Sequence, residues 1–300
     1  MPRYALILLV SIFFVILCHL VPGLAQAPFN HNTSASILKP VPSIFIPLQQ
    51  WLIAQGLDSR QVNLWLTSSQ VHFEGKLLAS MLSHRDASRD YKNFFTKNSL
   101  LRAKNFQARY KTSLEHTQKT TSVPQEIILA IILIESNLGS FTGATLTFNA
   151  LASQAALDTE DAIDILRVNW PKNQLEYLDS EASVTRFATR AAWARQELLA
   201  LIRLTNLWQK EIMLIKGSPA GAIGWCQFMP TSIEKWGSDG SGDYKIDLDN
   251  PHDAIASVGR YLQEHGWQTG LSYEEQVEVI LTYNKSRAYA EAVLNLAEKL

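Results

Sequence analysis

The sequence predicts a mainly α fold with one sizeable core. From about residue 43 onward, apolar residues recur at the three- and four-residue spacing of helices, and there is neither a series of strand-like segments nor an internal repeat. The 300 residues are 47% hydrophobic and 18% charged, a composition typical of globular proteins that excludes disordered and collagen-like classes. The formal net charge of −1 is unlike that of strongly basic nucleic-acid-binding domains, so we expect no nucleic-acid partner.

Residues 1–27 have the pattern of an export signal. Arg3 supplies a positive start, an apolar run follows from Tyr4 to Leu17, and small residues near Ala25 offer a cleavage site. Because the run is short for a membrane span, we expect a cleaved signal; the alternative is an uncleaved anchor that keeps the protein at the membrane. After cleavage Cys226 is the remaining cysteine, so no internal disulfide is expected.

Residues 28–43 are rich in Pro, Asn and Ser and are predicted to form a linker that leads into an N-terminal helical region at 44–120. Two helices are expected at the start of this region, separated by Gly56 and Asp58. In residues 81–120, Lys and Arg outnumber Asp and Glu by nine to three. Such a basic flank could help to hold an anionic polymer, but a solvated helix face is the simpler explanation.

The core region, predicted at 121–300, opens with a helix. Ser122 is expected to be its N-cap, and Gln125 is expected to complete a capping box. Eight apolar residues follow without a break at 127–134, which is typical of a helix that is buried on every side. We expect this helix to end at Gly139.

Glu135 directly follows that apolar run. A poorly hydrated environment and the negative end of the helix dipole both disfavour a charged carboxylate. A carboxylic acid that is still protonated near neutral pH can donate a proton to a leaving group, so Glu135 is the candidate catalytic acid. The alternative is that Glu135 only marks the point at which the helix reaches water.

The segment 217–230 combines three glycines, several small residues and one amide side chain, that of Gln227. Glycine lets the backbone approach a ligand closely, and the Gln227 side chain can both donate and accept hydrogen bonds. Such a segment is suited to line a cleft for a sugar that carries N-acetyl and hydroxyl groups. The alternative is a glycine-rich turn that leads into a helix.

Oxygen-bearing side chains alternate in the segment that begins at Asp239, which is how a loop wraps Ca²⁺. A standard calcium loop has glycine at its sixth position and glutamate at its twelfth, where this chain has Tyr244 and Asn250. The alternative is a surface turn without metal. Further on, Tyr283 and Asn284 are suited to sugar contacts and to hydrogen bonding a carboxyl group, although a structural tyrosine between helices is the simpler explanation for Tyr283.

Taken together and in this order, these four segments resemble one family, the bacterial lytic murein transglycosylases of the membrane-bound B type. The resemblance runs from about Phe45 to the C-terminus. It implies a lysozyme-like core with an additional N-terminal helical region, in an exported, periplasmic enzyme. It also implies cleavage of peptidoglycan glycan strands at the β-1,4 bond between N-acetylmuramic acid and N-acetylglucosamine, with a 1,6-anhydromuramoyl end as product. The resemblance implies that no cofactor is required; a structural Ca²⁺ is compatible with it, and proteins of cell-wall synthesis or remodelling are the implied protein partners.

The resemblance also implies roles for individual residues. Glu135 is the single catalytic group, which protonates the leaving oxygen and then takes the proton of the muramoyl 6-hydroxyl as that group attacks C1. The implied substrate-binding residues are Ser218, Gln227, Tyr261, Tyr283, Asn284 and Tyr289. The implied calcium ligands are Asp239, Ser241, Asp243, the Lys245 carbonyl and Asp253.

The chain departs from the family pattern at three places. Cys226 stands where the family usually has glycine, Tyr244 stands where the tight calcium loop prefers glycine, and the long insertion between Trp267 and Tyr283 is missing. Two rival functions remain open from the sequence. One is a goose-type, lysozyme-like hydrolase that uses water in place of the 6-hydroxyl, and the other is a non-catalytic peptidoglycan-binding protein.

Overall fold

The structure, a computed structural model, describes residues 39–83 and 90–300. The predicted export signal at 1–27 and most of the predicted linker at 28–43 lie outside the described residues. Within the described ranges, none of the helices combines the length and the apolar character that a bilayer crossing requires.

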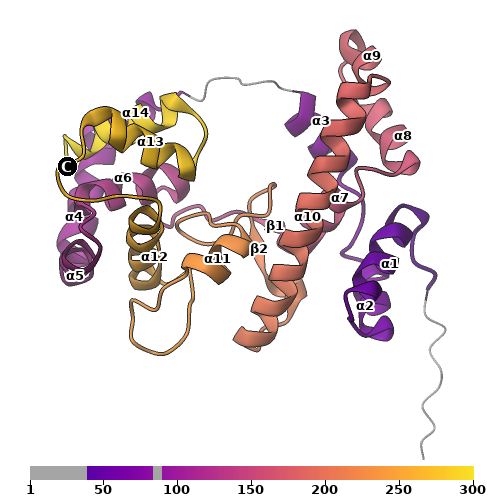
Figure 1. Ribbon diagram of the computed structural model, residues 1–300, viewed down its shortest axis with the longest axis horizontal. Helices are drawn as coiled ribbons and strands as arrows, with labels where there is room; N and C mark the ends of the chain where they lie inside the picture. Colours follow the sequence, from indigo (N-terminus) through magenta and orange to yellow (C-terminus); the bar gives the residue numbers. More distant parts are fainter. Residues whose placement is uncertain (1–38, 84–89) are drawn as a thin grey trace, which may run out of the picture. The chain divides into compact units, whose positions relative to one another are not determined.

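The described residues are mainly helical, as the sequence predicts, with fourteen α-helices and two strands of two residues each (Figure 1). The first five helices are α1 (Ile46–Ala54), α2 (Ser59–Leu66), α3 (Gly75–Ser83), α4 (Lys97–Arg109) and α5 (Lys111–Thr121). The next five are α6 (Gln125–Ser136), α7 (Thr147–Ala155), α8 (Glu160–Asn169), α9 (Leu175–Leu178) and α10 (Glu181–Trp208). The last four are α11 (Pro230–Trp236), α12 (Pro251–Glu264), α13 (Tyr273–Tyr283) and α14 (Arg287–Ala297). The strands are β1 (Thr145–Leu146) and β2 (Lys216–Gly217), and short 3₁₀ helices occupy Ser43–Phe45, Lys92–Phe95, Lys172–Gln174 and Ile212–Leu214.

The predicted pair of helices at the start of the N-terminal region is confirmed as α1 and α2. Gly56 adopts a positive φ of 89° between them, a conformation that glycine reaches without steric cost. The Asp58 carboxylate accepts a hydrogen bond from the Gln61 amide (2.8 Å) and so caps the N-terminus of α2.

The predicted buried helix is α6, and it lies at the centre of the core. All eight residues at 127–134 are at most 4% exposed. α6 packs against α5, α12 and α14, and the same hydrophobic core includes residues of α1, α2 and α4. Side chains from both sides of the predicted boundary at residue 120 therefore share one core, and the boundary itself stays a prediction.

The predicted ends of α6 are wrong in detail. Ser122 does not cap α6, because α5 extends to Thr121 and Ser122 is its left-handed C-cap, with a φ of 62°. The first amide of α6, that of Gln125, instead donates to the Gln118 side chain of α5 (2.9 Å). At the other end α6 stops at Ser136, three residues before Gly139, because Asn137 already adopts the left-handed conformation.

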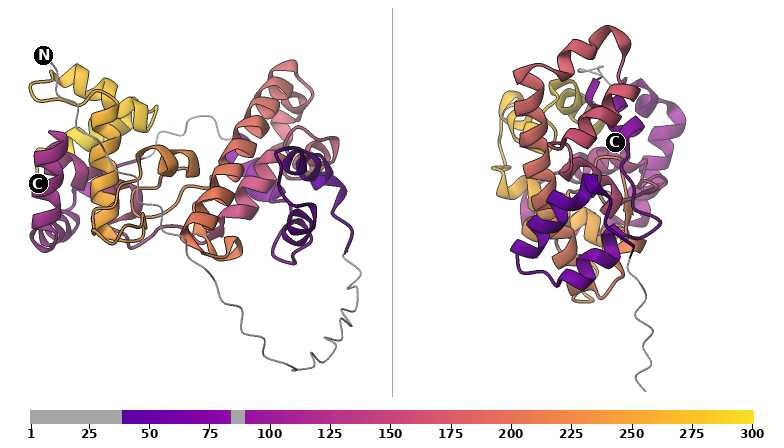
Figure 2. Two further views of the ribbon diagram at one scale, coloured as in Figure 1. Left: turned by 60° about the horizontal axis from the view of Figure 1, so that its bottom comes forward. Right: turned by 90° about the vertical axis from the view of Figure 1, so that its right-hand side faces the viewer.

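α10, the long salmon-coloured helix of Figures 1 and 2, packs against α7 and α11. Its N-terminal half contributes to a second, smaller hydrophobic cluster with α3, α8 and α9. At its C-terminal half, the buried carboxylate of Glu197 accepts hydrogen bonds from the Thr231 amide (2.9 Å) and hydroxyl (2.7 Å). Glu197 thereby satisfies the free backbone amide in the first turn of α11.

The two strands join distant parts of the chain. β1 follows α6, β2 opens the glycine-rich segment, and they pair antiparallel with Thr145 opposite Gly217. The backbones approach so closely that a Cβ atom at Gly143 would lie 2.1 Å from the carbonyl oxygen of Gly217. This pairing brings the predicted cleft segment beside the chain that leaves the Glu135 end of α6.

Candidate active site

Glu135 lies in the last turn of α6 and is half-buried. Its Oε1 atom accepts a hydrogen bond of 2.7 Å from the hydroxyl of Tyr289, a residue of α14 that is only 1% exposed. The predicted catalytic group therefore meets a predicted substrate residue that lies 154 positions away in the sequence.

Tyr283 and Tyr289 form a stacked pair beside Glu135, with ring centroids 6.4 Å apart and planes inclined by 9°. The Tyr283 hydroxyl donates to the Cys226 carbonyl (2.5 Å). Burial, and after it the nearby Cys226 and Glu135 groups, hold the pKa of Tyr283 well above its usual range. Tyr283 is therefore a neutral hydrogen-bond donor and not a source of negative charge in the site.

Tyr261 extends this aromatic group from α12. Its ring centroid lies 5.0 Å from that of Tyr283, and its hydroxyl donates to the Thr282 carbonyl (2.7 Å). It is 7% exposed, and burial raises its pKa. The three predicted tyrosines thus come together with Glu135, with their hydroxyl groups already bound to protein oxygens.

Gln227 and Ser218, the predicted substrate residues of the glycine-rich segment, hydrogen-bond the backbone in and beside that segment. Gln227 has a positive φ of 51°, and its Nε2 atom donates to the carbonyls of Thr142 (3.0 Å) and Gly224 (2.8 Å). The Ser218 hydroxyl accepts a hydrogen bond from the Ala222 amide (3.0 Å). Both side chains are half-buried, and Gln227 Oε1 accepts no hydrogen bond from the described residues.

Two further predicted positions flank this group. Asn284 is the half-buried C-cap of α13, and its Oδ1 atom accepts from the Ser286 amide (3.1 Å). Cys226, which stands in place of the family glycine, is completely buried, and burial raises the pKa of its thiol far above the physiological range. Cys226 therefore acts as a small apolar side chain under the site and not as a nucleophile.

The sequence analysis did not predict a buried polar pair, Gln154 and Arg190, which binds the backbone of the glycine-rich segment. Gln154 of α7 is fully buried, and its Nε2 atom donates to the Ala220 carbonyl (3.1 Å). Its Oε1 atom accepts from Nε of Arg190 in α10 (2.8 Å). The signal in the sequence was Gln154 itself, because a polar side chain in a helix of mostly small or apolar residues needs hydrogen-bond partners when it is buried.

The predicted calcium loop has a different organisation. Asp239 accepts hydrogen bonds from the backbone amides of Gly242 (2.6 Å) and Tyr244 (2.7 Å), and the fully buried Asp253 accepts from the amide of Asp247 (2.9 Å). Burial acts to raise the pKa of Asp239, but the amide hydrogen bonds outweigh it and lower that pKa.

Asp243 bonds within its own turn, through Oδ1 to the Lys245 amide (2.9 Å). Across the two described ranges, no three acidic, histidine or cysteine side chains converge as metal ligands. The predicted calcium site, which also includes the Ser241 hydroxyl and the Lys245 carbonyl, stays a prediction.

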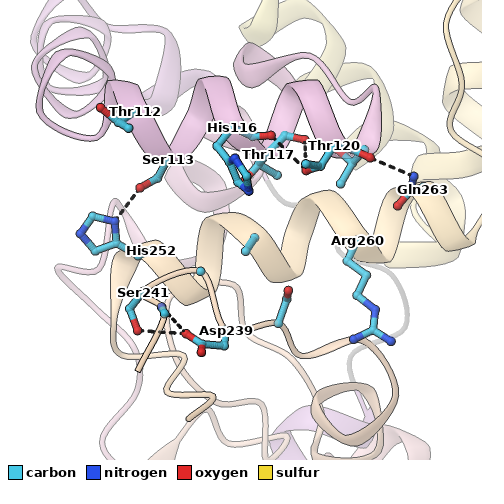
Figure 3. A pocket seen from close by; sticks show the side chains of 15 residues that line it. Thr112, Ser113, His116, Thr117, Thr120, Asp239, Ser241, His252, Arg260 and Gln263 are labelled. Atoms are coloured by element: carbon cyan, nitrogen blue, oxygen red, sulfur yellow. Dashed lines mark hydrogen bonds between the residues drawn. The ribbon is translucent and has the colours of Figure 1, made fainter. Parts of the chain in front are cut away.

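Asp239 and Ser241 also line a polar hollow of about 540 Å³ between this loop, α5 and α12 (Figure 3). Across α5 and α12 its walls carry mainly hydroxyl, imidazole and amide groups, including those of Ser113, His116, Thr120, His252 and Gln263. Glu135 and the three tyrosines beside it do not line this hollow.

Comparison with known proteins gives a consistent result. The chain is 34% identical over 179 residues to membrane-bound lytic murein transglycosylase B of Escherichia coli (strain K12), a match that covers 60% of this chain and 42% of that protein. The lytic transglycosylase SLT35 of E. coli, solved with bulgecin A, superposes with a TM-score of 0.68 at 22% identity and covers 86% of this chain and 92% of its own. The soluble lytic transglycosylase SltB1 of Pseudomonas aeruginosa superposes with a TM-score of 0.67 at 23% identity and covers 86% and 98%.

The structural likeness confirms the predicted lysozyme-like fold. The family described as Transglycosylase SLT domain matches residues 44–279, which is well over half of the chain. The match begins in the 3₁₀ helix Ser43–Phe45 before α1 and ends in α13, so it includes Glu135, the glycine-rich segment and the predicted calcium loop. The protein therefore belongs to the transglycosylase SLT domain family.

Proposed function

We propose that the protein is a lytic transglycosylase that cleaves peptidoglycan between N-acetylmuramic acid and N-acetylglucosamine and leaves a 1,6-anhydromuramoyl end. One observation carries the proposal: the carboxyl group that ends the buried helix α6 accepts a hydrogen bond from a buried tyrosine. Membership of the SLT family and the likeness to a murein transglycosylase support the reaction and the substrate.

In the proposed mechanism Glu135 acts twice. As an acid it protonates the glycosidic oxygen, and the bond from that oxygen to C1 of the muramoyl sugar breaks. As a carboxylate it then accepts the proton of the 6-hydroxyl while that oxygen bonds to C1, which regenerates the acid and needs no water. The Tyr289 hydroxyl donates a hydrogen bond to Oε1, so it stabilises the carboxylate between the two steps.

The product distinguishes this reaction from its rivals. Purified sacculi are digested, and the released muropeptides are weighed by mass spectrometry. Anhydro ends, lighter than hydrolysed ends by one water, are expected from the wild type and not from Glu135→Gln. Hydrolysed ends would support the goose-type hydrolase, and tight binding of sacculi without any release would support the binding protein.

The six predicted substrate residues divide into two groups in this proposal. Ser218, Gln227 and Asn284 are half-buried, and we assign them the contacts with the sugar N-acetyl and hydroxyl groups. Tyr261, Tyr283 and Tyr289 have their hydroxyls bonded to protein oxygens. We assign them to holding Glu135 and the neighbouring backbone at the sugar site, and the half-buried Tyr283 is the one of the three that can also contact substrate.

A structural calcium ion is the weaker part of the proposal. It is supported by the spacing of Asp239, Ser241, Asp243, Lys245 and Asp253, and E. coli SLT35 has been solved in complex with calcium. Asp243 Oδ1 accepts a hydrogen bond from the Lys245 amide, and calcium has no part in the mechanism above. A rise in melting temperature with Ca²⁺ over EDTA, abolished in Asp253→Asn, tests it.

We also propose export to the periplasm, either with the signal at 1–27 removed or with this segment kept as a membrane anchor. The proposed organisation is a helical region at 44–120 before a catalytic core at 121–300. Cell fractionation and N-terminal sequencing of the mature protein separate the two forms. Proteins that synthesise or remodel the wall are the proposed partners beyond the glycan strands.

A further inference from the structure

The turn that follows Glu135 has an unusual backbone. Asn137, Leu138 and Gly139 adopt positive φ angles of 52°, 59° and 74° in succession. Only glycine reaches this region without a steric cost, and leucine is a poor residue for it. Such a conformation persists where the surroundings impose it, and it is found preferentially at functional sites.

Part of what holds the turn is local. The Ser136 hydroxyl accepts a hydrogen bond from the Gly139 amide (2.9 Å), and the Leu138 amide donates to the Ile132 carbonyl (3.3 Å). On one side the ring of Trp225 covers the turn, because a Cβ atom at Gly139 would lie 2.1 Å from its Cε2 atom. None of these contacts binds the side chain of Asn137.

Asn137 is held by Arg102, a half-buried residue of α4. Arg102 Nη1 donates to Asn137 Oδ1 (2.9 Å), and Nη2 donates to the Asn137 carbonyl (3.0 Å) and to the Ser140 hydroxyl (3.2 Å). One guanidinium group therefore hydrogen-bonds both the side chain and the main chain of Asn137, two positions after Glu135. The planar fork of arginine can make these three bonds together, whereas the single nitrogen of lysine cannot span them in the same geometry.

We propose that Arg102 is a positioning residue for Glu135. It holds the left-handed turn that ends α6, and so it sets the direction in which the last helical turn presents the Glu135 carboxyl group. Tyr289 binds the carboxyl group from α14, and Arg102 fixes the backbone behind it from α4. The basic flank at 81–120, which contains Arg102, then contributes to catalysis through this residue. This inference rests on the proposed role of Glu135.

The test compares three variants on soluble glycan strands released from peptidoglycan. Arg102→Ala removes the three hydrogen bonds to Asn137 and Ser140, and Arg102→Lys keeps the aliphatic side chain and the positive charge. Lys104→Gln is the matched control because it removes an exposed cation of the same helix. We expect Arg102→Ala to lower kcat at least tenfold with KM within twofold of wild type. Arg102→Lys should lose at least threefold, and Lys104→Gln should keep wild-type kcat.

Two further measurements separate positioning from simple stability. Millimolar guanidinium ion should restore part of the kcat of Arg102→Ala and leave the other variants unchanged. Amide hydrogen exchange at 137–141 should be faster in Arg102→Ala than in Lys104→Gln, with exchange in α6 itself unchanged. Hydrogen exchange can be measured without enzyme activity, so it tests whether Arg102 holds the turn at 137–141 even if the wild type makes no anhydro product. Absence of that product would overturn only the proposed function.

The inference is overturned by either of two results. One is wild-type kcat in both Arg102 variants together with control-level exchange at 137–141. The other is faster exchange throughout α4 and α6, which would mean that Arg102 only stabilises the fold. If Arg102→Ala does not fold, Arg102→Lys and Asn137→Gly carry the test. Asn137→Gly relieves the backbone strain but removes the Oδ1 acceptor, so a two- to fivefold loss of kcat is expected.

Discussion

Replacement of Tyr289 by phenylalanine isolates the hydrogen bond to Glu135. The Tyr289 side chain is 1% exposed, stacks against Tyr283 and meets the edge of the Tyr91 ring with centroids 6.1 Å apart. Phenylalanine keeps all of these ring contacts and removes only the hydroxyl that lies 2.7 Å from Glu135 Oε1. The melting temperature is therefore expected to change little.

The size of the effect follows from the kind of bond that is lost. A hydrogen bond to a charged group contributes about 1.5–3 kcal/mol. This bond strengthens as Glu135 becomes a carboxylate, so its loss falls on the transition state of proton donation. At about 1.4 kcal/mol for each factor of ten, kcat should fall about 10- to 150-fold. KM should stay within about twofold, because the bond is made to the enzyme and not to the substrate.

The assay measures kcat and KM for release of anhydro-muropeptides, with the melting temperature of each variant recorded beside them. Tyr110→Phe, which changes a tyrosine at the α4–α5 junction that donates no hydrogen bond to the described residues, is the control for handling and folding. A Tyr289→Phe enzyme with kcat within twofold of wild type and an unchanged melting temperature would refute the reasoning. Tyr289 would then contribute only packing contacts and no catalytic hydrogen bond.

Two further predictions concern stability. Burial raises the pKa of Glu197, against the opposing hydrogen bonds from Thr231. The stability that Glu197 contributes is therefore fully present below its unfolded pKa of about 4.3 and is lost as pH rises through the raised folded value. Glu197→Gln removes the buried charge; its Oε1 can accept from the Thr231 amide, and its Nε2 can donate to the Thr231 hydroxyl oxygen. Its melting temperature should therefore fall less than that of wild type as pH rises between 5 and 7, and parallel curves would contradict this. Gly139→Ala places a Cβ atom 2.1 Å from Trp225 at a positive φ of 74°, so unfolding in urea should show a loss of at least about 1–2 kcal/mol. A loss below about 0.5 kcal/mol would mean that the turn relaxes freely.

Local patterns in the sequence were sufficient to predict α1, α2 and α6. Eight successive apolar residues at 127–134 are typical of a helix that is buried on every side, and the structure encloses them in this way. The same local pattern put Glu135 at the end of that helix. The capping of α6 was not predictable, because the choice of Ser122 as the C-cap of α5 depends on how far α5 continues.

The surroundings of Glu135 were predicted from a family resemblance and not from physical chemistry. Nothing in the residues near Tyr289 indicates a contact 154 positions away, because such contacts depend on how α6 and α14 pack. The five calcium ligands were likewise implied by the family resemblance. The structure adds that Asp243 Oδ1 accepts a hydrogen bond from the Lys245 amide.

The sequence by itself therefore determined the helical class, the burial of α6 and the position of its terminal carboxyl group, because hydrophobic spacing acts over a few residues. Only the tertiary structure decided what holds that carboxyl group. Tyr289 reaches it from α14 and Arg102 reaches the turn behind it from α4. These are hydrogen bonds between separate helices, and their geometry exists only after the core around α6 has packed.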